Sequence, residues 1–513
     1  MKKVIWAGAA VLVLVASGIG GYVYVNAKVR EAVDTALNTT LPAHPAVKSL
    51  DYDGYDFDLL GNTLTLRNPR IALDLSGLQE QMGIDQPGLS IGGVLNVAYS
   101  DLTARGIRGM AFGGTKIGQI SFASSSLEGT IVETLQDPDR VTVNDKEYDN
   151  SETPLKSATI TMTFTGTLGA AHAQGIDIGQ AQSLTNLPIN LPMDAFAAQD
   201  LKLKVMVETL IERKSTPETG APAVPLQTVP AMDVDITVAK MTLRGITPSS
   251  YKLARYENVT VEATPKDTGQ QAQKQKTSIG EIVMRDAQFV DHRPVRLGLD
   301  ITDWVFDTPE LKDPQARMVT ALLGVDQINL NMKLNYAFDS AKQTFGVQPF
   351  RLGLKQVGTF NLAFFLEGMP KTGVFDKLQK LRNNQEQLNA AFEDAFKDIA
   401  LDEINVGYED HGVLKRFLAS QAKALNTEPA KLADMYAKQG AMILSQAFGK
   451  DKSEDIKPEL VKFLTTPDAI NLRLKAKLPL KLKDFMADFK VSGPNALMAF
   501  QLYVITGKGA QLE

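Results

Sequence analysis

Two stretches of this sequence carry residue types that could bind a phosphate or a metal ion. The first is Gly109–Lys116, which has three glycines followed by a threonine and a lysine. A P-loop cradles phosphate with backbone N–H groups, and it needs the lysine before the Ser or Thr and a helix after them. Here the order is reversed and no strong helical pattern follows. We therefore expect no nucleotide site at this position.

The second stretch is Asp51–Asp58, in which four aspartates alternate with aromatic residues. A calcium loop of the EF-hand type places glycine at its sixth position and a bidentate glutamate at its twelfth. In this stretch Gly54 is the fourth residue, Tyr55 stands at a ligand position, and no glutamate closes the loop. The pattern is more typical of an edge strand with a bulge at Gly54.

The other candidates are also better explained as structure. Ser124, Ser125 and Ser126 lack the Gly-x-Ser-x-Gly elbow of a hydrolase. His292 lies in a polar turn, and Glu409-Asp410-His411 are adjacent, so they need distant partners to form a metal site. Asp410 is predicted to cap a helix that begins near Gly412. We therefore predict no catalytic, cofactor-binding or metal-binding residues and a function that is not enzymatic.

The composition narrows the function classes further. The chain has no cysteine, which excludes disulfides, thiolate nucleophiles and cysteine-ligated metals. Its four histidines are far apart in the sequence. The net charge of -5 is small for 513 residues and argues against a nucleic-acid partner.

The N-terminus predicts a membrane anchor. Lys2 and Lys3 precede an uncharged run, residues 4–25, which as a helix would span roughly 33 Å and cross a bilayer core. The two lysines favour a cytoplasmic N-terminus, so the rest of the chain would be translocated. A signal peptide cleaved after Ala27 or Ser17 is the alternative, although the run is long for one.

Most of the remaining chain alternates apolar and polar residues with a period of two, as half-buried strands do. In Ile328–Phe338 six apolar residues alternate with polar ones or alanine, and in Thr159–Thr165 three apolar residues alternate with threonines. Similar strands are predicted at 64–66, 71–75, 94–99, 117–122, 127–132, 201–205, 232–238, 259–263, 295–301, 350–354, 360–366, 404–408, 470–478 and 498–504.

From about residue 375 the period changes to that of helices. Helices are predicted at 375–397, 413–425, 429–448 and 458–464. The predicted fold class is α+β and predominantly β. An extended antiparallel sheet, curved or groove-forming, follows an N-terminal transmembrane helix, and the C-terminal portion is helical.

The predicted organisation has six parts. They are a transmembrane anchor (1–27), a helical stalk (28–45), a β-rich domain (46–212), a proline-rich linker or loop (213–230), a second β-rich region (231–370) and a mixed α+β C-terminal region (371–513).

Long strands with alternating residues have one apolar face, here called the dry face, which must be covered. The strands can bury it against one another and against the C-terminal helices. Alternatively, part of the face stays open as a groove for an apolar ligand. Periodicity does not distinguish these two arrangements.

The lysine-led anchor, the short stalk and the strand pairs at Leu50–Phe57, Leu64–Leu66 and Ile71–Leu75 resemble the YdgA-like envelope proteins of Gram-negative bacteria. More loosely, the chain is similar to the AsmA-like group. The first resemblance implies an inner-membrane anchor with a periplasmic body, and the second implies a part in lipid traffic or outer-membrane upkeep. The resemblance is architectural and assigns no functional residue.

These observations lead to one functional expectation with two alternatives. We expect a single-pass inner-membrane protein with a periplasmic body, which binds or shuttles lipids along a sheet groove. The first alternative is an envelope scaffold that binds another protein through an exposed sheet edge. The second is an envelope hydrolase.

Overall fold

The structure, a computed structural model, describes residues 34, 36–40, 47–58, 62–75, 89–110, 114–136, 140–143, 146–149, 155–179, 192–213, 227–247, 249–265, 274–290, 293–306, 327–371, 374, 385–449 and 453–507. The chain divides into two compact units, Met1–Ser278 (unit 1) and Ile279–Glu513 (unit 2). The predicted anchor, residues 4–25, lies outside the described residues. Within the described residues, no helix has the length and apolar character needed to cross a bilayer.

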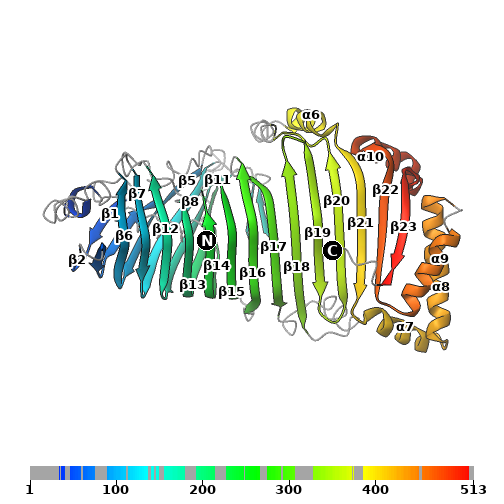
Figure 1. Ribbon diagram of the computed structural model, residues 1–513, viewed down its shortest axis with the longest axis horizontal. Coiled ribbons are helices and arrows are strands. Elements are labelled where there is room, and N and C mark those ends of the chain that lie inside the picture. Colours follow the sequence, from blue (N-terminus) through cyan, green and yellow to red (C-terminus); the bar gives the residue numbers. More distant parts are fainter. Residues whose placement is uncertain are drawn as a thin grey trace, which may run out of the picture. The chain divides into compact units, whose positions relative to one another are not determined.

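Antiparallel strands dominate both units, so the predominantly β fold class is confirmed (Figure 1). The chain of unit 1 begins, within the described part, with the helical turn η1 (Ala36–Thr40). Its strands are β1 (Val47–Asp51), β2 (Gly54–Asp58), β3 (Thr63–Arg67), β4 (Arg70–Asp74), β5 (Leu89–Tyr99), β6 (Asp101–Met110), β7 (Gly114–Phe122), β8 (Ser125–Gln136), β9 (Arg140–Val143), β10 (Lys146–Asp149), β11 (Leu155–Leu168), β12 (Ala171–Gly179), β13 (Met193–Arg213), β14 (Gln227–Ile246) and β15 (Ser250–Pro265).

The strands of unit 1 pair in two layers. One layer has the order β2-β3-β6-β7-β12, and the other has the order β1-β4-β5-β8-β11. Their inward side chains form one buried cluster, in which the Tyr99 ring of β5 meets the Phe122 ring of β7 edge-on at 5.0 Å. Two-residue alternation thus supplies a dry face to each layer, and the layers cover each other.

The two layers meet on β13, the longest strand. Its segment Ala195–Ala198 pairs with β12, and its segment Lys202–Arg213 pairs with β11. Asp200 lies between the two segments with φ 51°, in the left-handed region that Asp and Asn tolerate better than most residues. On the neighbouring strands, Ala239 and Lys240 are both exposed and Asn258 has φ 51°. The alternation of buried and exposed residues in β14 therefore changes phase at Ala239–Lys240.

Strand β16 (Gln275–Val290) contains the residues at which the two units divide. In unit 2 the strand order is β17-β18-β19-β20-β21-β22-β23, all antiparallel. These strands are β17 (Arg293–Phe306), β18 (Ile328–Asp339), β19 (Thr344–Leu354), β20 (Gly358–Glu367), β21 (Ala400–Asp410), β22 (Ala469–Lys481) and β23 (Phe500–Thr506). Strand β16 lies beside β17, as the ion pair between Arg285 of β16 and Asp300 of β17 indicates.

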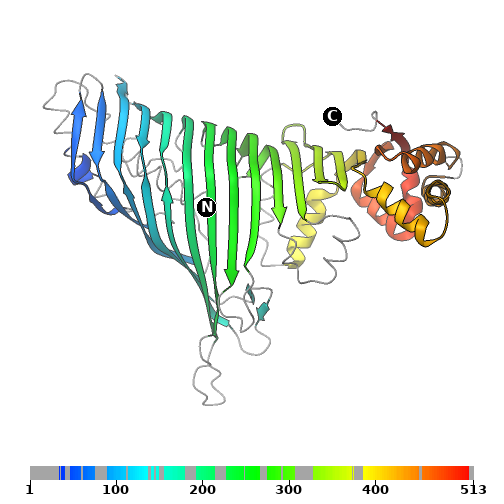
Figure 2. The same cartoon turned by 90° about the horizontal axis from the view of Figure 1, so that it is seen from below.

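In the chain, the helices of unit 2 alternate with its later strands, and α8 and α9 lie beside β23 at the end of the sheet (Figures 1 and 2). They are α6 (Gln385–Phe396), α7 (Val413–Ala424), α8 (Pro429–Phe448), α9 (Ser453–Thr465), α10 (Leu482–Ser492) and the short η5 (Gly493–Ala499). The helices predicted at 413–425 and 429–448 are confirmed, as is a helix over 458–464, although α9 begins earlier. Helix α10 was not predicted.

The division into unit 1 and unit 2 does not test the domain boundaries predicted from the sequence. Residues 214–226 of the predicted linker lie outside the described residues, and the last four residues of that linker belong to β14. The predicted stalk is described only at Asp34 and η1.

The backbone at Asp200 can be tested by a pair of substitutions at this exposed position. Asp200→Gly should leave the free energy of unfolding of unit 1 nearly unchanged, because glycine adopts φ 51° without a steric penalty. Asp200→Val should lower it by about 1–2 kcal/mol, because a β-branched residue is strained there. Urea unfolding followed by circular dichroism measures both. Equal stability of the two variants would contradict the bent path of β13.

Candidate functional site

The main candidate site is one face of the unit 2 sheet, here called the apolar face. Residues that stand opposite each other in antiparallel register share a face, and in unit 2 nearly all residues on this side are large and apolar. They are Leu297, Leu299, Ile301, Trp304 and Phe306 of β17, Leu330, Met332, Leu334, Tyr336 and Phe338 of β18, Phe345, Val347, Phe350, Leu352 and Leu354 of β19, Phe360, Leu362, Phe364 and Leu366 of β20, Leu401, Ile404, Val406 and Tyr408 of β21, Ile470, Leu472 and Leu474 of β22, and Phe500, Leu502 and Val504 of β23.

Helices cover the apolar face over β21–β23. Leu502 of β23 is buried in a cluster with Ala441 of α8 and Ile456 of α9. The ring of Phe463 in α9 meets the ring of Tyr408 edge-on, with 6.4 Å between the centroids. Burial raises the pKa of Tyr408, whose hydroxyl donates a hydrogen bond to the carbonyl of Val357 at 3.0 Å. At this end the arrangement is an ordinary core between helices and sheet.

The apolar face is more open over β17–β20. Leu352 and Phe360 stand opposite each other on β19 and β20, and their exposed fractions are 37% and 39%. Met332 stands opposite Leu352 on β18 and is half-buried. Among the paired apolar-face residues that the structure describes, Leu352 and Phe360 are the ones left exposed. Among the described residues, the apolar face is therefore least covered at Leu352 and Phe360, next to the helix-covered strand β21.

Aromatic rings line the open part. The Phe345 ring lies 6.0 Å from the Tyr336 ring and 6.0 Å from the Phe364 ring, so three neighbouring strands contribute to one row. On β17 the rings of Trp304 and Phe306 lie 5.0 Å apart. All three pairs are tilted, with 37–47° between the ring planes. They form a continuous apolar wall that suits hydrocarbon and offers few polar groups.

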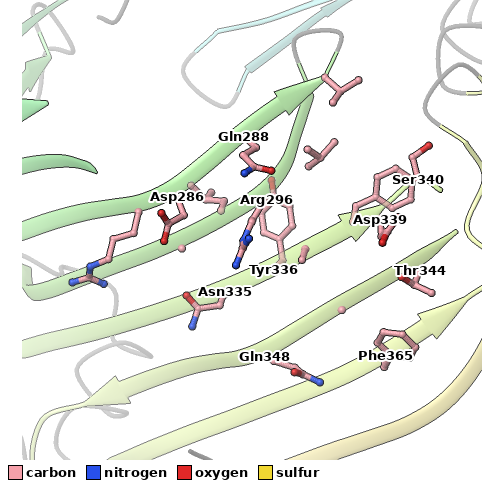
Figure 3. Close-up of a pocket in the computed structure, with 18 residues that line it drawn as sticks. Asp286, Gln288, Arg296, Asn335, Tyr336, Asp339, Ser340, Thr344, Gln348 and Phe365 are labelled. Atoms are coloured by element: carbon pink, nitrogen blue, oxygen red, sulfur yellow. The ribbon is translucent and has the colours of Figure 1, made fainter. Parts of the chain in front are cut away.

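A hollow of about 740 Å³ lies on the opposite, polar face of the same sheet (Figure 3). One cross-strand row explains it. Arg296, Ala337, Gly346 and Phe365 stand side by side on β17 to β20, so two large side chains flank two positions with little or no side chain. The small residues leave a notch two strands wide.

The polar groups around this hollow do not converge on one point. Arg285 forms an ion pair with Asp300, and the carboxylate of Asp339 accepts hydrogen bonds from the backbone N–H groups of Ala341 and Lys342. Those backbone hydrogen bonds hold the pKa of Asp339 below its usual value. Within the described part of the chain, Arg296 has no ion-pair partner. The hollow can hold a small polar molecule, but it contains no nucleophile activated by a base.

The structure separates the residues of the two motif-like stretches. Gly109 and Thr115 are paired across the β6–β7 hairpin, and Lys116 forms an ion pair with Asp177 at 3.1 Å. Residues 111–113 of this stretch lie outside the described residues.

Of the aspartates in the second stretch, Asp51 ends β1, Asp53 lies in the bend that follows, and Asp56 and Asp58 belong to β2. The carboxylate of Asp56 pairs with Arg67, and that of Asp53 accepts a hydrogen bond from Asn68 at 2.8 Å. Among the described residues, no three carboxylate or histidine side chains are arranged as metal ligands.

The predicted capping role of Asp410 is confirmed. Its carboxylate accepts hydrogen bonds from the backbone N–H groups of Gly412 at 2.8 Å and Leu414 at 3.0 Å, at the start of α7. His411 lies 3.8 Å from the Glu409 carboxylate and has no further acidic ligand described near it. His292 lies outside the described residues.

Sequence reasoning missed the notch of the polar hollow. The signal was present in Gly298 and Gly346, which are glycines inside strands and often mark a site where something approaches the backbone closely. Using that signal requires the register of β17 to β20, and the alternation of single strands does not contain it.

Comparison with known proteins gives little help with function. A family described only as an uncharacterized protein matches residues 351–504, from β19 to β23. No curated protein matches the chain. The matched stretch includes both the open pair Leu352–Phe360 and the covered strands β21–β23.

A matched pair of leucines tests where the apolar face is covered. Leu502→Ala should lower the free energy of unfolding of unit 2 by about 2–5 kcal/mol, because it leaves a cavity in a packed core. Leu352→Ala should lower it by no more than about 1 kcal/mol, because that side chain is partly in water. Chemical unfolding of both variants measures the difference. Equal losses would mean that Leu352 is also covered.

Proposed function

We propose that this protein is a non-enzymatic, membrane-anchored protein of the bacterial envelope that binds the acyl chains of lipids on its apolar face. The observation that carries the proposal is the exposed pair Leu352 and Phe360 within an otherwise continuous apolar face. Soluble proteins rarely expose large contiguous apolar surfaces, and those that exist commonly bind something. An apolar ligand would cover this surface without needing hydrogen bonds or ion pairs.

The size of the open part suits a hydrocarbon chain. Neighbouring strands lie about 4.7–4.9 Å apart, so β17–β20 offer an apolar track of roughly 15 Å across the strands. Each buried CH₂ group contributes about 0.8 kcal/mol, so a chain lying along this track gains several kcal/mol. Both partners contribute to this gain, because the hydrocarbon chain of the ligand and the apolar side chains of the protein are both removed from water.

The proposed location rests on the N-terminus. The uncharged residues 4–25 after Lys2 and Lys3 suit a single inner-membrane span, with the body in the periplasm. A tethered body with an apolar track could carry or shield acyl chains in the aqueous space between two membranes.

A scaffold that binds protein through a sheet edge is the second candidate. Strand β23 pairs with β22, and within the described strands it has no second neighbour. A hollow of about 510 Å³ beside this edge is lined in part by Arg473, Lys475, Tyr503 and Ile505. An added strand with acidic and apolar residues would fit there by β-augmentation. For the third candidate, a hydrolase, the described residues offer no supporting constellation.

Lipid extraction tests the leading proposal. The full chain, purified in mild detergent, should carry acyl lipid that mass spectrometry of an organic extract detects. The double variant Leu352→Gln/Phe360→Gln should bind a fluorescent fatty acid about ten-fold more weakly, because a loss of roughly 1.4 kcal/mol of apolar contact corresponds to a factor of ten.

Lys333→Gln is the matched control, since Lys333 is exposed on the polar face of β18. It should bind the fatty acid like the wild type. Lipid around the anchor is common to all three proteins and cancels in the comparison. Equal binding by the double variant and the wild type would rule out the apolar face as the binding surface.

A further inference from the structure

Helix α10 is bound to the body of unit 2 by few contacts. It follows β22 directly and lies at one end of β22 and β23 (Figure 1). The ring of Phe485 meets the ring of Phe500 edge-on at 5.6 Å, which holds the helix on the sheet. No residue of α10 is buried, although the helix contains four large apolar residues between Leu482 and Phe489. Met486 has an exposed fraction of 49%.

The apolar residues of α10 form one stripe. Leu482, Phe485, Met486 and Phe489 follow the spacing i, i+3, i+4, i+7, so they share a side of the helix. Phe485 is at the edge of this stripe that turns toward the sheet. Leu482, Met486 and Phe489 are left exposed to solvent. A surface helix normally turns such a stripe to the core, so the unburied part needs another explanation.

The charges of α10 are arranged unequally around the stripe. At about 100° per residue, Lys483 and Lys490 fall beside Met486, whereas Asp484 and Asp488 fall on the opposite side. Both lysines are exposed, and neither has an ion-pair partner among the residues that the structure describes. Lys481, just before the helix, is 2.8 Å from the Asp398 carboxylate.

We propose that α10 docks on the surface of an anionic lipid bilayer. Leu482, Met486 and Phe489 enter the boundary between headgroups and acyl chains, and Lys483 and Lys490 meet anionic headgroups. An interfacial helix combines an apolar side with flanking lysines in this way. The two lysines favour a lipid surface as the partner, because positive charge beside an apolar stripe complements anionic headgroups. The chain as a whole carries a net charge of -5, so this positive side is local.

Docking at α10 would bring one end of the apolar face to the membrane. The backbone N–H of Leu482 donates a hydrogen bond to the carbonyl of Ile399 at 2.7 Å, at the start of β21. In the next row Leu366, Leu401 and Leu480 stand side by side on β20, β21 and β22. The inference does not depend on lipid binding by the apolar face, because α10 can attach to a bilayer whether or not that face holds a ligand.

The absence of cysteine allows a local measurement on the full chain. Met486→Cys introduces a single thiol, which is labelled with a polarity-sensitive fluorophore. The protein is mixed with vesicles of phosphatidylcholine alone or with added phosphatidylglycerol. Val491→Cys is the control, because Val491 is 88% exposed and falls away from the stripe. A label at residue 486 reports insertion of α10 itself, whatever the N-terminal segment does.

We expect the label at residue 486 to shift to the blue and to be quenched by spin-labelled lipid in the anionic vesicles. The label at residue 491 should stay in water. Lys483→Gln and Lys490→Gln should each weaken the response about five-fold, and added salt should weaken it further. No shift at residue 486, or equal shifts with neutral and anionic vesicles, would overturn the proposal. The Leu352→Gln/Phe360→Gln variant tests lipid binding by the apolar face. It should leave the response of the label at residue 486 unchanged.

Discussion

The structure depends on the need to cover a sheet face that is apolar along nearly its whole length. Each strand with a period of two buries alternate side chains at about 1.5–3 kcal/mol for each large one, while ordering its backbone costs about 1–2 kcal/mol per residue. A strand is therefore stable only when its dry face meets another apolar surface. The two units meet this requirement in different ways.

Unit 1 covers its dry faces by itself. Its two layers share β13 and place their inward side chains in one cluster, where Ile117 and Leu64 are almost completely buried. Unit 2 has a single layer of strands from β17 to β23, and α8 and α9 cover the last of them. Tyr408 lies under these helices, and the next residue along that row, Phe360, is exposed. The proposed ligand takes the place of the missing cover.

The periodicity of apolar residues within single segments predicted much of this fold. The threonine-lined stretch at 159–165 is in β11, Ile328–Phe338 is in β18, and the helix predicted at 429–448 has the bounds of α8. Each of these elements is determined by side-chain periodicity over seven or more residues, which can be read directly from the sequence. The question whether the dry face is covered or open could not be answered from it, because cover depends on which distant segments meet.

The features missed have physical reasons as well. Helix α10 follows Lys481 without a break, and the alternation of β22 runs up to it, so the change from strand to helix has no turn signal. The two-layer arrangement of unit 1 requires the pairing of β13 with both β11 and β12, which no single strand specifies. The polar hollow needs the register of four strands. Topology and register are long-range properties, and a periodic sequence is compatible with several of them.

The most direct test of the central claim is an experimental structure of the full chain purified with its native lipids. The account predicts elongated density along the apolar face, in contact with Met332, Leu352 and Phe360. A face covered by a segment of the chain itself, with Leu352 and Phe360 buried against protein, would contradict it.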